Sequence, residues 1–296
     1  MAQPYTEHTL KLPDGIEIRY TDSGAPQTVD YTTLVVIHGT GFNGYCFLKL
    51  HELAHKYNLR VAILNRRDYH GSTKFSDEDL ADMHAGRRIF QDRLATQVAS
   101  FMQHFIEHES TPTVNADRTS GGFLLMGWSS GCSVALAPFA DRDVLPSGLY
   151  DAVEPYLRSL VLYDPPVHKL PPAGTGYNPF LDPEFTDPET VYEMFQLWVS
   201  SYFNHPDIAS GAPQGVSLEK YTPKRTTKDW TEEQMARCYE KAAAARSIVA
   251  ASVLPHLHTD APLTARQRLT HANDTGCSDA QRALRRVPRR LTLPPR

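Results

Sequence analysis

The stretch FLLMGWSSG, residues 123–131, is the most informative part of this sequence. Its first four residues are apolar without interruption, which is typical of a strand buried on both faces of a parallel sheet. The pattern Gly-x-Ser-x-Gly follows at once and leads into a small, apolar stretch, residues 132–140, that predicts a buried helix. The two glycines permit a very tight strand-to-helix turn, so we expect Ser129 at a strained backbone angle with its hydroxyl exposed.

A serine in such a turn is a candidate nucleophile. The N-terminus of the following helix directs backbone N–H groups toward it, so the N–H of Ser130 is a candidate donor to an oxyanion. An earlier apolar run, residues 33–37, stops at HGTGF, residues 38–42. Because a glycine-rich turn at the end of a neighbouring strand would lie beside the serine, we expect the N–H of Thr40 to be the second donor.

Strands and helices alternate along the rest of the first half of the chain. Four further strands are expected, at residues 9–12, 16–20, 60–64 and 160–163. Two further helices are expected, at residues 46–58 and 86–109. The second of these has an apolar stripe that includes Ile89. Such alternation predicts the α/β class, with right-handed crossovers and a mostly parallel sheet that has helices on both faces.

The composition changes twice after the last of these strands. From about residue 167 to 255 the periodicity is helical and rich in aromatics, which predicts an inserted cap. Residues 256–296 contain eight Arg and three Asp, a net charge of +5 in a chain whose net charge is -4. We therefore expect three parts: a core (1–166), a helical cap (167–255) and a basic tail (256–296) that does not pack as regular structure.

Three motifs together resemble the α/β-hydrolase superfamily. HGTGF looks like its oxyanion loop and GWSSG like its nucleophile elbow. NRRDYHGS, residues 65–72, is similar to the following D-x-R-G-x-G-x-S loop, with Asp68 and His70 where relatives often have Gly. The resemblance covers residues 8–255 and extends to fungal α/β-hydrolase proteins, some of which are linked to secondary-metabolite and toxin pathways. It implies the α/β-hydrolase fold with an inserted cap.

The resemblance also implies a triad in the order Ser, acid, His, with the acid after a seventh strand and the histidine after an eighth. No strand pattern follows Ser252, so we expect the C-terminal third to be truncated or replaced and the last strands to be missing. Asp164 is the candidate acid, because it ends a strand on the same sheet edge as Ser129; otherwise it caps the Pro-Pro turn. Four histidines are candidate bases, the first two ranked first: His256, His258, His168 and His271. Each is otherwise a surface histidine.

Aromatic side chains favour a small, fairly apolar substrate. Five of them are expected to line its pocket: Phe42, Trp128, Tyr192, Phe195 and Trp198. An aromatic helical stripe is also explained by packing alone. The function that fits best is a serine hydrolase acting on an ester, thioester or lactone of a small metabolite. The alternative is a catalytically impaired hydrolase fold that binds a ligand, or a truncated protein.

HELAH, residues 51–55, matches HExxH, which in zinc proteases puts two imidazoles on one helix face. We expect Leu53 and Ala54 to face inward and His51 and His55 to lie on the surface, so a zinc protease is the least favoured function. No metal or organic cofactor is implied. The four cysteines form no CxxC pair, which argues against a cysteine-rich zinc site.

Charge and hydropathy argue against nucleic acid and membrane as partners and leave a small-molecule substrate. A net charge near zero gives the main body no reason to bind nucleic acid. No run of about 18 apolar residues occurs, the first ten residues do not read as a signal peptide, and the last three are not a peroxisomal signal. We expect a cytoplasmic protein without membrane insertion. The sequence does not indicate the oligomeric state.

Overall fold

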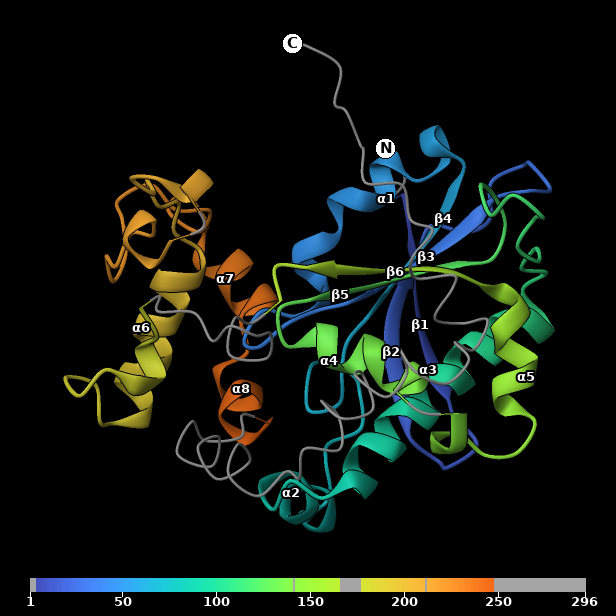
Figure 1. Ribbon diagram of the computed structural model, residues 1–296, viewed down its shortest axis with the longest axis horizontal. Coiled ribbons are helices and arrows are strands. Elements are labelled where there is room, and N and C mark those ends of the chain that lie inside the picture. The colour runs from blue at the N-terminus through green and yellow to red at the C-terminus, as the bar shows by residue number, and fades with distance from the viewer. Residues whose placement is uncertain (1–3, 141, 166–176, 211, 248–296) are drawn as a thin grey trace, which may run out of the picture. The chain divides into compact units, whose positions relative to one another are not determined.

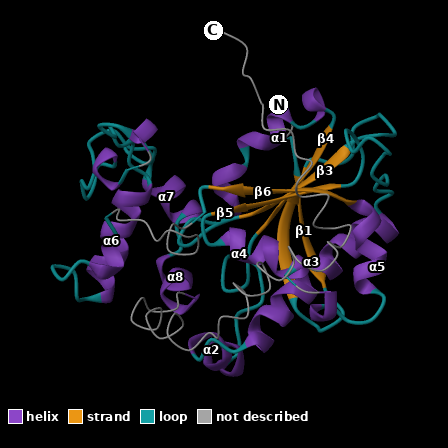
Figure 2. Ribbon diagram, in the orientation of Figure 1, coloured by secondary structure: helices purple, strands orange, loops and turns teal. Residues whose placement is uncertain are grey.

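The computed structural model describes residues 4–140, 142–165, 177–210 and 212–247. Six described strands form one sheet in the order β1-β2-β4-β3-β5-β6 (Figure 2). Their bounds are β1 (Thr6–Lys11), β2 (Glu17–Asp22), β3 (Thr32–Ile37), β4 (Leu59–Leu64), β5 (Phe123–Trp128) and β6 (Leu157–Tyr163). Strands β3 to β6 are mutually parallel, and β2 joins the antiparallel β1–β2 hairpin to β4. The prediction of a mostly parallel sheet opened by a hairpin is confirmed.

Helices cover both faces of this sheet. The α-helices are α1 (Lys49–Leu53), α2 (Asp77–His84), α3 (Arg88–His108), α4 (Gly131–Leu136), α5 (Leu149–Val153), α6 (Pro188–Val199), α7 (Glu232–Cys238) and α8 (Lys241–Ser247). Helix α1 lies on one face of the sheet, and α3 and α4 lie on the other (Figure 1). The uninterrupted apolar run of β3, residues 34–37, lies between these layers, as expected for a strand that is covered on both faces.

Strand β3 shows how the two layers are filled. Val35 and Ile37 belong to the core under α3, whereas Val36 belongs to a second core that includes Ala54. Val35 and Val36 are completely buried. Since successive side chains of a strand point to opposite faces, a continuous apolar run supplies both cores.

Three helix predictions need correction. The stretch predicted as one buried helix, residues 132–140, is α4 as far as Leu136 and then a 3₁₀ turn, Ala137–Phe139. The stretch predicted as one helix, residues 46–58, is a short α-helix, α1, between two 3₁₀ turns, Gly44–Phe47 and His55–Tyr57.

Helix α3 begins at Arg88, and Ile89 is 46% exposed instead of lying on the apolar stripe. At the first turn of α3, Phe90 takes the buried position and packs against Phe75. Leu94 packs in the same cluster as Phe90, and the part of the stripe from Val98 to Phe105 packs in the sheet core as predicted.

Strand β6 is longer and more exposed than predicted. It begins at Leu157, and Leu162 and Tyr163 at its end are 38% and 54% exposed. Among the described strands β6 pairs with β5 alone. The prediction of a buried strand is therefore wrong for these side chains, because an edge strand has a neighbour on one side only.

The described residues after β6 form helices and loops. Helices α6 to α8 fall in the segment predicted as a cap, and Tyr192 and Phe195 of α6 are buried. The predicted basic tail, residues 256–296, and the question of further strands after Ser252 lie outside the described residues. In the described ranges, no helix is both long and apolar enough to span a bilayer.

Candidate active site

Ser129 occupies the turn between β5 and α4 that the sequence predicts. Its φ is 51°, in the left-handed region that non-glycine residues rarely adopt. Its backbone N–H donates to the carbonyl oxygen of Tyr163 at 3.0 Å, which ties the turn to the end of β6. Ser129 is half-buried. A strained serine held between two strand ends is the geometry of a nucleophile elbow.

Glycine is required on both sides of this turn by close approach of the backbone. A Cβ atom on Gly131 would lie 2.4 Å from the carbonyl oxygen of Ile37, so α4 can pack onto the end of β3 only without a side chain there. A Cβ atom on Gly39 would lie 2.9 Å from the Cβ atom of Ser129. The loop after β3 therefore lies directly against the candidate nucleophile, as the HGTGF motif predicts.

Thr40 and Ser130 are the predicted oxyanion donors, and both follow residues in this close contact. Within the described parts of the chain, neither the N–H of Thr40 nor that of Ser130 donates a hydrogen bond. Both residues are half-buried. Two unengaged N–H groups beside a strained serine are what stabilisation of a tetrahedral oxyanion needs.

His38, the first residue of the motif, has a structural role. It is completely buried, its Nδ1 donates to the Gly39 carbonyl oxygen at 2.8 Å, and its Nε2 accepts the N–H of Arg66 at 3.0 Å. Burial lowers the pKa of His38 well below its ordinary value, and the charge of Arg66 lowers it further. A neutral imidazole with both nitrogens bonded ties the oxyanion loop to the end of β4 and is not available as a base.

Polar side chains of three loops meet beside the serine. The hydroxyls of Thr40 and Ser130 are 2.9 Å apart. The guanidinium of Arg66 donates from Nη1 to Ser130 Oγ at 2.8 Å. The Arg66 guanidinium also lies 5.5 Å from the ring centre of Tyr69, whose hydroxyl accepts the N–H of Gly41 at 2.9 Å. The oxyanion loop, the elbow and the loop after β4 therefore form one hydrogen-bonded unit.

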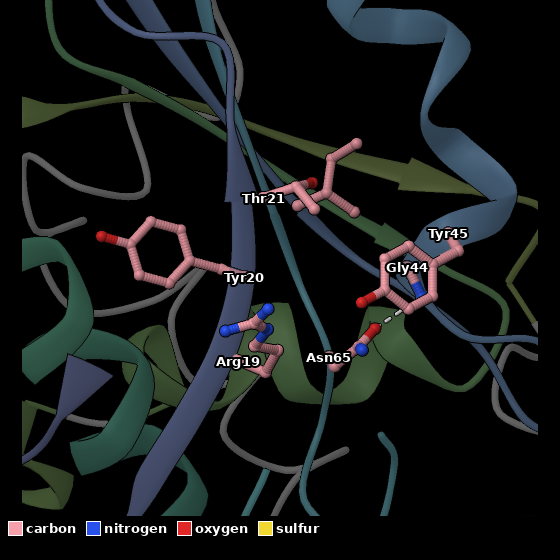
Figure 3. Close-up of a pocket in the computed structure, with 7 residues that line it drawn as sticks. Arg19, Tyr20, Thr21, Gly44, Tyr45 and Asn65 are labelled. Carbon is pink, nitrogen blue, oxygen red and sulfur yellow. Dashed lines mark hydrogen bonds between the residues drawn. The ribbon is translucent and has the colours of Figure 1, made fainter. Parts of the chain in front are cut away.

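Asn65 fixes the other end of the oxyanion loop. Its Oδ1 accepts the N–H of Gly44 at 2.9 Å (Figure 3), and its Nδ2 donates to the carbonyl oxygen of His70 at 2.9 Å. Asn65 and Gly44 border a hollow next to Arg19 and Tyr45 that has no room for a water molecule. Ligand sites are typically about 300–1,000 Å³, so this hollow is a packing feature.

The segment after α7 pairs with the oxyanion loop. Phe42 and Tyr239 form an isolated antiparallel bridge, with ring centres 4.9 Å apart. The N–H of Glu240 donates to the Gly41 carbonyl oxygen at 2.8 Å, and a Cβ atom on Gly41 would lie 3.1 Å from the ring of Phe195. Aromatic side chains of the predicted cap therefore contact the loop that carries Thr40.

The five predicted pocket residues do not form one group. Phe42 packs near Trp128, with ring centres 6.5 Å apart, and Phe195 lies over the oxyanion loop. Tyr192 is buried instead against α8, where its hydroxyl donates to the carbonyl oxygen of Ala244 at 3.3 Å. Trp198 lies 6.0 Å from Phe195, between ring centres. The contacts thus bring Phe42, Trp128 and Phe195 to the site and leave Tyr192 in the packing of the helices.

Asp164 occupies the matching position at the next strand end. Trp128 pairs with Tyr163 in the β5–β6 register, so Ser129 and Asp164 are the first residues beyond the paired ends. Asp164 is exposed and has a φ of 48°. Burial raises the pKa of the Cys132 thiol, and the Asp164 carboxylate raises it further, so this carboxylate lies near α4.

The candidate bases cannot be compared with this geometry. His256, His258, His168 and His271 all lie outside the described residues. Among the residues that the structure does describe, no imidazole forms a hydrogen bond with the Ser129 hydroxyl. The structure thus places a candidate nucleophile, two candidate oxyanion donors and a candidate acid at one edge of the sheet, and the base stays a prediction.

The HELAH histidines differ from the prediction. His51 is buried, its Nε2 lies 2.8 Å from the Thr21 hydroxyl, and its ring stacks on Tyr5. Leu53, expected to face inward, is 46% exposed. The reason is that α1 ends at Leu53, so His55 falls in a separate 3₁₀ turn and bonds the Gly24 carbonyl oxygen. Two imidazoles on different turns, with different partners, do not make the HExxH face.

Two features of the site were not found from the sequence. One is Arg66 beside Ser130; the available signal was a charged residue at an unspecified position of the D-x-R-G-x-G-x-S pattern. The other is Asp68, whose buried carboxylate pairs with Arg246 of α8 at 3.3 Å while its φ is 71°. Aspartate tolerates this left-handed region better than most residues, which explains how it replaces glycine there.

Comparison with known proteins identifies the family. A model of the alpha/beta hydrolase family matches residues 34–293. This chain belongs to that family. The motifs, the strand order and the match agree, so the predicted α/β-hydrolase fold is confirmed. None of the curated protein sequences matches the chain.

Solved structures to which this chain is similar include three enzymes with different printed activities. The epoxide hydrolase CorEH is 17% identical over 65% of this chain, with a TM-score of 0.36, and this chain spans 50% of its length. A mutant of the N-acyl homoserine lactonase AidH is 15% identical over 87% of this chain and 70% of its own, with a TM-score of 0.41. The esterase EaEST from Exiguobacterium antarcticum is 13% identical over 83% of this chain and 73% of its own, with a TM-score of 0.44. Similarity at this level says nothing about which bond this chain cleaves.

Proposed function

We propose that this alpha/beta hydrolase is a serine hydrolase that acts on an ester, thioester or lactone of a small, fairly apolar metabolite. The observation that supports the proposal is the close approach of Gly39 to Ser129, with unengaged N–H groups on the two following residues, Thr40 and Ser130. Ser129 Oγ attacks the carbonyl carbon, and these N–H groups stabilise the oxyanion that forms.

Proton transfer needs a base that an acid orients. We assign the acid to Asp164, because it ends the strand next to the nucleophile turn at the same sheet edge. His256 and His258 are the bases to test first. The base takes the serine proton during attack and gives it to the leaving alcohol or thiol, and water then hydrolyses the acyl-enzyme by the same steps.

The substrate is a small molecule, and its apolar part contacts Phe42, Trp128 and Phe195 in this proposal. No resident metal or organic cofactor takes part. The resemblance to fungal hydrolases supports a role in secondary-metabolite or toxin biosynthesis. We also propose the division into a core (1–166), a helical cap (167–255) and a basic tail (256–296).

A second candidate function is ligand binding without turnover. It is favoured by one observation, that in the described ranges no imidazole bonds the Ser129 hydroxyl. A serine hydroxyl without a positioned base is a weak nucleophile at neutral pH.

Labelling of the folded full-length protein with a fluorophosphonate separates the two functions. A serine hydrolase is labelled at Ser129, which peptide mapping identifies, and Ser129→Ala abolishes labelling. Ser133→Ala, on the same helix, serves as the matched control and keeps the label. A label on any other residue overturns the serine mechanism, and no label on a sample with a cooperative melting transition favours ligand binding.

A further inference from the structure

Arg66 is a charged side chain next to the nucleophile that the proposed acyl transfer does not use. It follows β4 and is half-buried. Its Nη1 donates to Ser130 Oγ at 2.8 Å and approaches the carbonyl oxygen of His38 at 3.4 Å. Since Ser130 directly follows Ser129, the guanidinium lies one residue from the candidate nucleophile.

The charge of this guanidinium has no ion-pair partner among the described residues, although the carboxylate of Asp68 is close enough to act on it electrostatically. The closest acids in sequence have other partners: Asp68 pairs with Arg246 at 3.3 Å, and Asp79 pairs with Arg67 at 2.9 Å. Burial lowers the pKa of Arg66, which reflects the free energy needed to remove the charge from water. A half-buried cation of this kind is stabilised when an anion binds beside it.

The donors that remain on Arg66 suit one kind of anion. Nη1 is engaged with Ser130 and His38, whereas Nε and Nη2 donate no hydrogen bond to any described residue. Nε–H and one Nη2–H point in parallel from the same edge of a guanidinium, which matches the two oxygens of a carboxylate.

We propose that Arg66 binds a carboxylate of the substrate, so that the preferred substrates are esters, thioesters or lactones with an acidic group close to the scissile carbonyl. This inference rests on the proposed function and refines it. Aromatic side chains such as Phe195 contact the apolar part of the substrate, and the guanidinium selects the acid.

Two matched esters test the selectivity. The 4-nitrophenyl monoester of glutaric acid carries a carboxylate, and 4-nitrophenyl pentanoate has a chain of similar length without one. We expect the wild-type kcat/KM to be higher for the acid ester. Arg66→Gln should reduce kcat/KM for the acid ester at least about tenfold more than for the neutral ester, and Arg66→Lys should restore part of the difference. Arg87→Gln, which removes an exposed charge elsewhere, is the control. Equal losses on the two esters, or no wild-type preference, overturn the inference.

Measuring how tightly two unreacted esters bind to the Ser129→Ala protein tests this inference separately from the proposed function. Calorimetry with monomethyl glutarate and with methyl pentanoate measures affinity without turnover. Tighter binding of the acid, weakened at least about tenfold by adding Arg66→Gln, supports the carboxylate site even if neither nitrophenyl ester is hydrolysed. Hydrolysis of the neutral ester together with equal or absent binding of the two methyl esters overturns the carboxylate site and leaves the hydrolase intact.

Discussion

Strands β5 and β6 are neighbours in one sheet, but they differ in how many strands they pair with and in how deeply their side chains are buried. Strand β5 pairs on both sides, and Phe123 and Leu125 are completely buried. Strand β6 pairs, among the described strands, on one side only, and its last residue, Tyr163, is 54% exposed. The turn with the candidate nucleophile therefore follows a strand that is paired on both sides, and the turn with the candidate acid follows a strand that is paired, among the described strands, on one side.

The same contrast applies to the two strained residues. Ser129 and Asp164 both have a positive φ, 51° and 48°. The backbone around Ser129 is confined by Gly39 and Gly131, whereas Asp164 is exposed. Strain persists where the surrounding structure over-determines the backbone, so we expect the geometry of Ser129 to be the more rigid of the two.

The largest expected effect is on the less rigid turn. Asp164→Asn keeps the shape of the side chain and removes the charge that orients the base, so ester hydrolysis should fall by about 10³-fold in kcat. The free energy of unfolding should change by less than about 0.5 kcal/mol, because the residue is exposed. Steady-state kinetics and urea unfolding measure the two effects, with Asp151→Asn, an exposed acid of α5, as the control. Unchanged hydrolysis would assign the acid elsewhere.

The packing contrast is tested by one leucine from each strand. Leu125→Ala in β5 should lower the free energy of unfolding by about 3 kcal/mol, because it leaves a cavity in a closed core. Leu162→Ala in β6 should lower it by less than about 1 kcal/mol, since that side chain is 38% exposed. Urea titrations of both variants give the difference. Equal losses would show that β6 is covered in solution.

Alanine substitutions at two glycines test whether the backbone around Ser129 is closely packed. Gly131→Ala places a methyl group 2.4 Å from a carbonyl oxygen and should cost about 3 kcal/mol of stability and abolish fluorophosphonate labelling. Gly148→Ala has no atom within 4 Å but a φ of 81°, and should cost about 1 kcal/mol of backbone strain alone. Labelling that survives Gly131→Ala would mean that the turn is not confined as described.

The smallest expected effect is on the pH dependence of the free energy of unfolding, and it distinguishes the buried histidine of HELAH, His51, from the exposed one, His55. Burial lowers the pKa of His51 to about 4, so the unfolded chain takes up this proton first and stability is lost as the pH falls from about 6.5 toward 4. Removing the imidazole in His51→Gln should reduce this acid-dependent loss by about 2 kcal/mol, and His55→Gln should leave it unchanged. Urea unfolding at several pH values between 7.5 and 4.5 measures it. If the free energy of unfolding of His51→Gln falls with pH as steeply as that of the wild type, the loss does not come from His51.

Local patterns were sufficient for the strands and the nucleophile. The apolar runs that end in HGTGF and GWSSG gave β3, β5 and the turn at Ser129, because a parallel strand covered on both faces and a tight glycine turn leave short-range signals. The same patterns failed where side-chain environment depends on a distant partner. The buried imidazole of His51 contacts Thr21, which is 30 residues away, and the apolar side chains at the end of β6 are exposed on a strand that is paired, among the described strands, on one side.

The sequence by itself determined the class of fold, the serine in its strained turn and the two glycine-rich loops, since these follow from contacts between residues close in the chain. Only the tertiary structure decided that Arg66 lies beside Ser130, that Phe42 pairs with Tyr239 and that Asp68 reaches Arg246. Those contacts join residues 64 to 197 positions apart, so no local pattern of the sequence predicts them and only folding of the whole chain brings the partners together.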